Sequence, residues 1–282
     1  MSQITFFPDR LWHGVTLAFP QNDLHSLPSS SWTVKQKISE TSSMYTQEEA
    51  EEWRQFPLAA ASFECENAED SNNKTILRVF MEIPCADTNC AAEGGYKTPN
   101  SVNIAVGAHK LLTLNNAQYS PKLVQYMEQT QTPESRRFFL PGGRIYYVII
   151  NKLPGTPLGN GLVSYTGDGR SFEEGLFWNL SRDERDRVRA AFQIAYREHT
   201  RSRVTVAPSS LSEIFWDKES GNVYIQGHFE PLDQRDIAPT LYYELNEYGP
   251  KVLRMWGLAI APKFDVDYNV PMAELEKKGW VL

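Results

Sequence analysis

The sequence has little cysteine and no long apolar run, and these two shortages exclude several classes of protein. Only three cysteines occur in 282 residues, Cys65, Cys85 and Cys90, which are too few and too unevenly placed for a disulfide framework. Cys85 and Cys90 have no matching His or second Cys pair at zinc-ligand spacing. No run approaches the roughly 20 apolar residues of a membrane span. We therefore expect reduced thiols, no bound zinc and no membrane partner.

The chain also lacks a basic excess and a secretory leader. Its net charge is −7, whereas nucleic-acid binding needs clustered Lys and Arg. The basic residues between Arg182 and Arg203 alternate with acids on a predicted helix, a pattern typical of a solvated face. Pro8 and Asp9 stand where a signal peptide would be apolar. We expect a cytoplasmic protein without a nucleic-acid partner, folded because 41% of its residues are hydrophobic and 22% charged.

Glu213 to Glu230 reads EIFWDKESGNVYIQGHFE and predicts a β-hairpin at 213–226. Two short β-prone runs flank a polar segment there. Gly221 in that segment can adopt the positive φ that such a turn needs. After the second run, Gly227 and His228 end the β pattern, so a polar side chain would face whatever the hairpin lines.

A second hairpin is predicted from Leu58–Cys65 and Lys74–Ile83. In its second strand, Ile76, Arg78 and Phe80 share one face, and the residues between them share the other. Arg78 either lies at an edge, paired with Glu82 or another acid, or points into a cleft.

The remaining pattern gives an α+β chain with two lobes. Ser181 and Glu184 form a capping box for a helix that runs to about residue 199. We expect an N-terminal arm at 1–56, a β-rich lobe at 57–153, and a mainly helical lobe at 154–282 that contains the hairpin at 213–226. The other expected elements are helices at 47–56, 101–114 and 239–248, strands at 121–127 and 144–153 (the latter buried on both faces), and a glycine-rich connector at 156–170.

Six segments, taken in order, resemble a divergent, short protein-kinase-like family of filamentous fungi. The segments are FEC at 63–65, TILRVFMEIP at 75–84, SPKL at 120–123, LPGGRIYYVIINKLPGTPL at 140–158, FWNLSRDERDRVRAAF at 177–192, and the IFWD…GNVYI…FE hairpin. The resemblance implies a two-lobed kinase-like fold with a β-rich N-lobe and a truncated, helical C-lobe.

The same resemblance implies a pseudokinase, because the chain departs from the kinase pattern at its chemical positions. Arg78 stands in place of the nucleotide-binding lysine, and Ala105 or Gly107 in place of the helix glutamate. Pro208 stands for the catalytic Asp. The two magnesium ligands fall on Glu213 and on His228 or Gly227, and no glycine-rich loop precedes the first strand pair. Phosphotransfer from ATP, a metal and a nucleotide cofactor are therefore not expected.

A kinase-like cleft would still suit a hydrophobic small molecule or a protein partner. Arg78 and His228 are the catalytic candidates, with Glu213 or Glu230 orienting the His228 imidazole. The alternative for His228 is a half-buried histidine bonded to a loop, and for Trp216 and Phe229 plain core. The expected ligand-binding residues are Ile76, Phe80, Ile150, Asn151, Leu153, Trp216 and Phe229.

Three functions remain open from the sequence. The first is a catalytically degenerate kinase-like protein that binds a ligand or partner between its lobes. The second is a repurposed, cofactor-independent enzyme of fungal secondary metabolism, a cyclase or isomerase that uses Arg78 or His228. The third is an atypical phosphotransferase. The sequence carries no signal for an oligomeric state.

Overall fold

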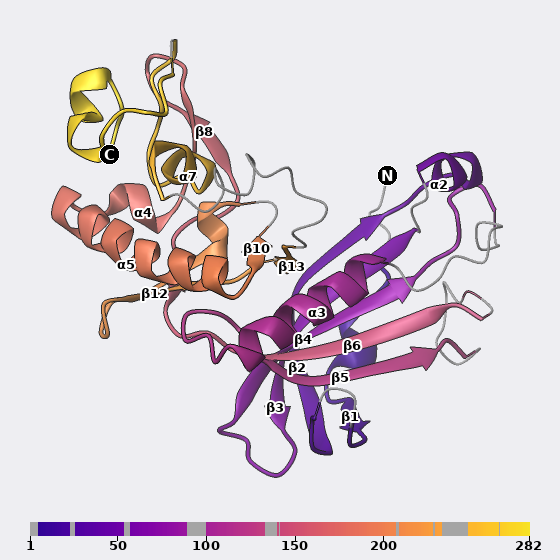
Figure 1. Cartoon of the computed structure of the whole chain (residues 1–282). Helices are drawn as coiled ribbons and strands as arrows, with labels where there is room; N and C mark the ends of the chain where they lie inside the picture. The colour runs from indigo at the N-terminus through magenta and orange to yellow at the C-terminus, as the bar shows by residue number, and fades with distance from the viewer. Residues whose placement is uncertain are drawn as a thin grey trace. The chain divides into compact units, whose positions relative to one another are not determined.

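The computed structural model divides the chain into two compact units (Figure 1), which we call unit 1 and unit 2. Unit 1 comprises Met1–Val106 and Lys122–Lys152, and unit 2 comprises Gly107–Pro121 and Leu153–Leu282. Helices and strands are mixed and the largest sheet is antiparallel, which confirms the mixed α/β class. The structure describes residues 5–22, 26–53, 57–88, 100–132, 140, 142–206, 209–227, 229–232, 248–264 and 266–282.

Unit 1 is built on a six-stranded sheet in the order β1-β2-β3-β4-β6-β5. Every neighbouring pair is antiparallel. The β3–β4 hairpin and the expected strand and helix positions are confirmed. The elements are α1 (Asp9–Trp12), β1 (Thr16–Phe19), β2 (Ser30–Ser43), α2 (Gln47–Trp53), β3 (Leu58–Asn67), β4 (Lys74–Glu82), α3 (Asn100–Leu114), β5 (Leu123–Thr130) and β6 (Arg144–Asn151).

Both faces of this sheet are covered by apolar side chains. On one face Leu77, Val79 and Met81 join a cluster with the N-terminal aromatic residues, including Phe7. On the other face Ile76 and its neighbours pack against Val102 and Val106 of α3, the helix drawn across the sheet in Figure 1. The period-2 pattern of β4 thus predicted correctly which side chains share each face of the sheet. β6 has six consecutive buried residues and is buried on both faces, as predicted.

β2 is the longest of the strands that the sequence pattern did not reveal. It is 14 residues long, and only its first half places apolar side chains, Trp32 and Val34, in the core. Its pairing with β3 shifts register between Val34 and Gln36 and again between Lys37 and Ser39. Each shift changes which side chains face the core, so no continuous alternation exists to be read.

Unit 2 combines three small sheets with helices. The elements are β7 (Thr156–Pro157), β8 (Val163–Tyr165), β9 (Ser171–Glu173), α4 (Leu176–Asn179), α5 (Arg182–Arg201), β10 (Val204–Val206), η3 (Leu211–Glu213), β11 (Ile214–Asp217), β12 (Asn222–Ile225), β13 (Phe229–Pro231), α7 (Pro250–Met255), η4 (Met272–Glu274) and η5 (Glu276–Lys278). β11 and β12 form the predicted hairpin, whose turn contains Gly221 at φ +72°.

α5 is the central helix of unit 2. Its capping box is present: the Ser181 side chain accepts the Glu184 backbone N–H, and the Glu184 carboxylate accepts the Ser181 N–H. The predicted stripe, including Val188, Phe192 and Ala195, lies in the apolar cluster of this unit together with the β11–β12 hairpin. Sequence periodicity therefore identified both the start and the buried face of this helix.

Several expectations fall outside the described residues: the helix at 239–248 apart from Tyr248, and the positions of Cys90, Pro208 and His228. Cys65 and Cys85 are buried free thiols, and burial raises the pKa of Cys65 to about 12. Within the described ranges, no helix combines the length and the apolar character needed to cross a membrane.

Candidate functional site

Two chain segments meet at the open end of the β11–β12 hairpin, and we call this place the hairpin site. η3 leads into β11 with Glu213 as its last residue, and Gln226 and Gly227 follow β12. The Gln226 N–H donates to the Glu213 carbonyl (2.8 Å). β13 then pairs with β10, with Phe229 opposite Val206. The segments before and after the hairpin are therefore held side by side in unit 2.

Gly227 is the residue that lets these segments approach so closely. Its φ is +141°, and a Cβ at this position would lie 2.6 Å from Val206 Cγ1 and 3.2 Å from a carboxylate oxygen of Glu213. A larger residue would be strained by the backbone conformation and by these contacts. The Glu213 carboxylate is thus packed against a position that carries no side chain.

The described residues of the hairpin site do not fit a pair of kinase magnesium ligands. Mg²⁺ prefers an octahedral set of oxygens, usually with one or two carboxylates. Glu213 supplies one carboxylate, and Gly227 has neither a ligand nor room for one. In the described parts of the chain, no three His, Cys, Asp or Glu side chains are grouped as a metal site. We derive no metal-dependent step here.

Glu173 of β9 fixes the backbone on the other side of η3. Its carboxylate accepts N–H bonds from Gly161 (2.9 Å), Leu211 (2.8 Å) and Ser212 (3.0 Å), and a hydroxyl bond from Ser210 (2.8 Å). The negative charge therefore caps the N-terminus of η3. Glu173 is not predicted from the sequence, because nothing in its own neighbourhood indicates that its carboxylate reaches a residue 38 positions away.

Beneath the hairpin site lies a buried Ser–His pair. The Ser120 Oγ and the His199 Nε2 are 2.5 Å apart, and the Phe229 ring stands between the imidazoles of His109 and His199, 5.1 and 5.3 Å from them. Ser120, His109, His199 and Phe229 are all at least 97% buried. The pair lies in the interior of unit 2.

This Ser–His pair is not equipped for nucleophilic catalysis. Burial lowers the pKa of His199 to about 3, whereas a general base works best with a pKa near the working pH. At neutral pH the imidazole is therefore uncharged, and it shares a hydrogen bond with the Ser120 hydroxyl. The neighbouring Glu198 carboxylate accepts the N–H groups of Gln118 (2.7 Å) and Tyr119 (2.8 Å). α5 thus anchors the segment between α3 and β5.

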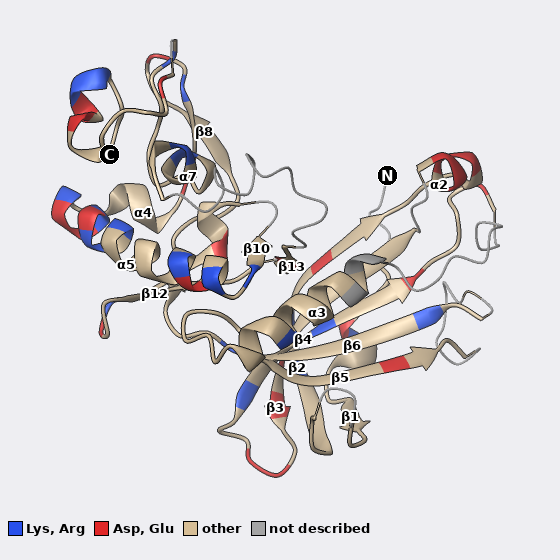
Figure 2. Ribbon diagram, in the orientation of Figure 1, with Lys and Arg blue, Asp and Glu red and all other residues tan. Residues whose placement is uncertain are grey.

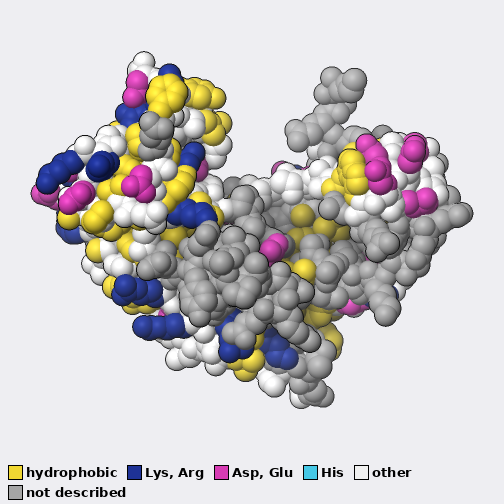
Figure 3. Space-filling view, turned by 45° about the horizontal axis from the view of Figure 1, so that its top comes forward, with side chains coloured by type: hydrophobic (Ala, Val, Ile, Leu, Met, Phe, Trp, Pro, Cys, Tyr) yellow, Lys and Arg dark blue, Asp and Glu magenta, His cyan; other side chains and the backbone are white. Residues whose placement is uncertain are grey.

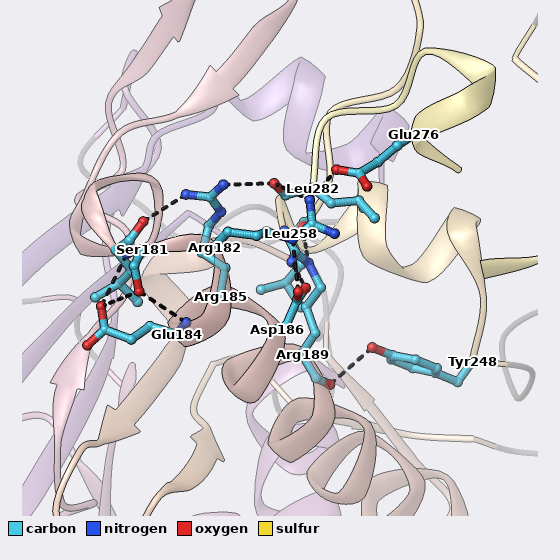
Figure 4. A network of polar contacts seen from close by, with 11 residues as sticks. Ser181, Arg182, Glu184, Arg185, Asp186, Arg189, Tyr248, Leu258, Glu276 and Leu282 are labelled. Atoms are coloured by element: carbon cyan, nitrogen blue, oxygen red, sulfur yellow. Dashed lines mark hydrogen bonds and ion pairs between the residues drawn. The ribbon is translucent and has the colours of Figure 1, made fainter. Parts of the chain in front are cut away.

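The first half of α5 carries a polar network that contradicts a fully solvated face (Figure 4). Arg189 is 5% exposed; it pairs with Asp186 (2.6 Å), donates to the Leu258 carbonyl (2.9 Å), and lies over the Phe177 ring. Burial lowers the pKa of Arg189 to about 10. The charge pattern missed this because Arg189 follows Val188 at the border of the apolar stripe.

The other predicted site residues are divided between the units. In unit 1, Ile76, Phe80 and Ile150 belong to the cluster beside α3, Arg78 is half-buried on β4, and the Asn151 side chain accepts the Lys122 N–H. In unit 2, Leu153 is buried, Trp216 and Phe229 are core, and Glu230 lies opposite Thr205. The structure brings together Glu213, Gly227 and Phe229, while His228 lies outside the described residues.

Comparison with known proteins finds similarity among solved structures. No protein-family model matches the chain, and no curated protein matches it. Two similar solved structures are the PK-1 kinase of Cydia pomonella granulovirus (TM-score 0.38, 10% identity, 70% of this chain and 50% of that one) and vaccinia related kinase 3 (TM-score 0.35, 12% identity, 80% and 52%). The chain spans about half the length of each.

Proposed function

We propose that this chain is a kinase-like protein that does not transfer phosphate from ATP and acts by binding a ligand or partner. The order of elements in unit 1 supports the kinase-like part. A β3–β4 hairpin is followed by α3 and then by β5 and β6, with β6 between β4 and β5. Arg78 on β4 then holds the place of the nucleotide-binding lysine, two strands after the β2–β3 connection.

The β2–β3 connection is the observation that carries the loss of phosphotransfer. In protein kinases, a glycine-rich loop before the lysine strand covers the nucleotide phosphates. Residues 44–57 contain no glycine and four glutamates. Within this connection Gln47–Trp53 form α2, whose Glu48, Glu51 and Glu52 are exposed; the acidic residues of α2 are drawn red in Figure 2. The carboxylates of this helix would repel the phosphates of a nucleotide, whereas a kinase binds them there with backbone N–H groups.

The hairpin site supports the same conclusion from unit 2. Where two magnesium-binding side chains would meet, the chain has Glu213 packed against Gly227. The Glu213 carboxylate alone would leave most of the charge that develops during phosphoryl transfer without compensation. Arg78 keeps a positive charge but not the compact ammonium group of a lysine. Binding remains the activity that this arrangement can perform.

Incubation of the protein with ATP and Mg²⁺ tests this proposal. We expect no phosphate release or autophosphorylation above that of a heat-denatured sample. A triple variant of α2, Glu48→Gln/Glu51→Gln/Glu52→Gln, should bind ATP more tightly than the wild type if the acidic helix repels the nucleotide. The matched control is Glu69→Gln/Glu219→Gln/Glu274→Gln, which removes three exposed acids elsewhere. Turnover of ATP by the wild-type protein would overturn the proposal.

A further inference from the structure

Unit 2 contains a pocket of about 410 Å³ between the β8–β9 hairpin and the segment that follows α7. Its walls include Arg170 and Ser171 from the hairpin, Arg254 and Met255 from the end of α7, and Lys263 beyond it. Pockets that hold small molecules measure about 300–1,000 Å³. The pocket is separate from the hairpin site and from α2, so it is independent of whether the chain uses ATP.

Two of the charged groups in this wall are already engaged by the protein. The Arg170 guanidinium pairs with Asp168 (2.9 Å) and donates to the Gly279 carbonyl (3.0 Å). The Glu173 carboxylate is occupied by the N–H groups at the start of η3. Arg170 and Glu173 therefore build the wall, and their charges are balanced within unit 2.

Arg254 and Lys263 differ, because their hydrogen-bond partners are neutral. The Arg254 guanidinium donates to the Tyr268 hydroxyl and lies over its ring, and the Lys263 ammonium donates to the Asp168 carbonyl (3.2 Å). In the described part of the chain, neither forms an ion pair with a carboxylate. A protein with a net charge of −7 thus places on one pocket two cations that pair with no carboxylate of the described residues.

Exposed apolar side chains also line the pocket. Val163 is 63% exposed and Met255 is 43% exposed, and both line the same cavity as the two cations. Figure 3 shows apolar and basic side chains exposed beside one another on this unit. Exposed apolar surface next to charged groups is typical of a ligand site.

We propose that this pocket binds a small organic anion, with a carboxylate or phosphate group at Arg254 and Lys263 and an apolar body against Val163 and Met255. Arg and Lys recognise both kinds of anion through charge-assisted hydrogen bonds. A pocket of about 410 Å³ favours a small molecule over a protein surface. The expected ligand is therefore a small molecule that carries one anionic group and one apolar group.

Titration with four probes, followed by calorimetry or NMR, tests the proposal. Phenyl phosphate and benzoate carry both groups, inorganic phosphate carries the charge alone, and phenol carries the ring alone. We expect phenyl phosphate, benzoate or both to bind more tightly than inorganic phosphate and phenol, and more weakly as salt is raised. The tighter of the two distinguishes a phosphate ligand from a carboxylate ligand. Equal binding of phenol, or no binding of either organic anion, would overturn the proposal.

Variants locate the binding. Arg254→Gln and Lys263→Gln should each weaken the organic anion about tenfold, the effect of losing one charged hydrogen bond. Arg187→Gln and Lys277→Gln remove exposed cations that do not line the pocket and should change affinity less than twofold. Ser171→Trp keeps both cations, fills the pocket from β9, and should abolish binding. Equal losses in the control variants would contradict the assignment.

The same variants keep this inference distinct from the proposed loss of phosphotransfer. ATP is itself an organic anion and could bind in this pocket without being hydrolysed. A thermal shift with ATP that disappears in the Arg254→Gln/Lys263→Gln double variant belongs to the pocket and supports the inference. A shift that persists in the double variant comes from another site and says nothing in favour of the pocket, so the probe titrations alone then decide it.

Discussion

Units 1 and 2 satisfy their backbone groups in different ways. In unit 1 the six-stranded ladder pairs the N–H and C=O groups, with strands of up to 14 residues. In unit 2 the strands are two to four residues long, so more of the backbone lies in loops. Buried or partly buried side chains such as Glu173, Arg189 and Glu198 bond those loop groups instead.

This difference determines which residues matter for stability in each unit. Polar groups buried inside a protein must be hydrogen-bonded, because leaving one unsatisfied costs about 1–3 kcal/mol. Unit 1 has its buried acid at the end of the sheet, where Glu82 accepts the Arg144 N–H (2.8 Å) and burial raises its pKa. We expect unit 1 to be most sensitive to apolar truncation and unit 2 to loss of single polar side chains.

The largest effect is expected in the core of unit 1. Ile149 of β6 is fully buried in the cluster on the Leu77 face. Ile149→Ala should lower the free energy of unfolding by about 3–4 kcal/mol, because the transfer energy is lost and a cavity remains. Denaturant unfolding measures it. Ile38→Ala on β2, 56% exposed, is the control and should cost under about 0.5 kcal/mol. Similar losses for both would refute the packing argument.

In unit 2 a single carboxylate should matter nearly as much. Glu173→Ala removes the acceptor of three N–H groups and one hydroxyl and should cost about 2–3 kcal/mol. Glu173→Gln keeps one carbonyl oxygen and should cost less. The neighbouring Glu174→Ala serves as the control in the same denaturant titration. If Glu173→Ala is as mild as Glu174→Ala, loops in unit 2 do not depend on this side chain.

The buried imidazole of His199 should make stability depend on pH. Its pKa is about 3 in the folded protein and 6.5 ordinarily, so below pH 6.5 the unfolded chain binds a proton that the folded protein excludes. Stability is then lost as pH falls, by about 1.4 kcal/mol per pH unit, or roughly 2 kcal/mol at pH 5. Unfolding measured between pH 7 and 5 checks this slope.

Variants assign that slope to His199. His199→Gln cannot take up a proton and should flatten the dependence between pH 7 and 5, whatever it does to stability at pH 7. His13→Gln replaces an exposed histidine of unit 1 and should leave the slope unchanged. A slope that survives in His199→Gln would mean that the Ser120–His199 pair does not govern acid sensitivity.

The comparison of the units also explains what the sequence could predict. Hydrophobic periodicity gave β3, β4, β6 and the buried stripe of α5, because each follows one period without interruption. β2 was missed because two register shifts break its alternation. In β3, β4, β6 and α5 the local hydrophobic pattern agrees with the burial seen in the structure, whereas in β2 it does not.

The candidate site was less accessible to sequence reasoning than the fold. The resemblance implied that the magnesium-ligand positions fall on Glu213 and on His228 or Gly227, and the structure adds that a Glu213 carboxylate oxygen lies 3.2 Å from where a Cβ of residue 227 would stand. Glu173, Ser120 and His199 were not found, because their partners are 37 to 79 residues away. Long-range polar contacts leave no periodic signal. The pocket of Arg254 and Lys263 is of the same kind, since it joins segments about 90 residues apart.

The smallest effect is expected at the one polar feature of unit 2 that is local in sequence, the capping box of α5. Ser181→Ala removes the acceptor of the Glu184 N–H and should cost about 1 kcal/mol, while Ser181→Asp should retain most of the cap. Thermal or denaturant unfolding measures both, with Ser171→Ala on an exposed strand as the control. If Ser181→Ala lowers the free energy of unfolding as much as Glu173→Ala does, the local helix cap and the long-range carboxylate contribute equally to stability. That result would contradict the contrast drawn between them.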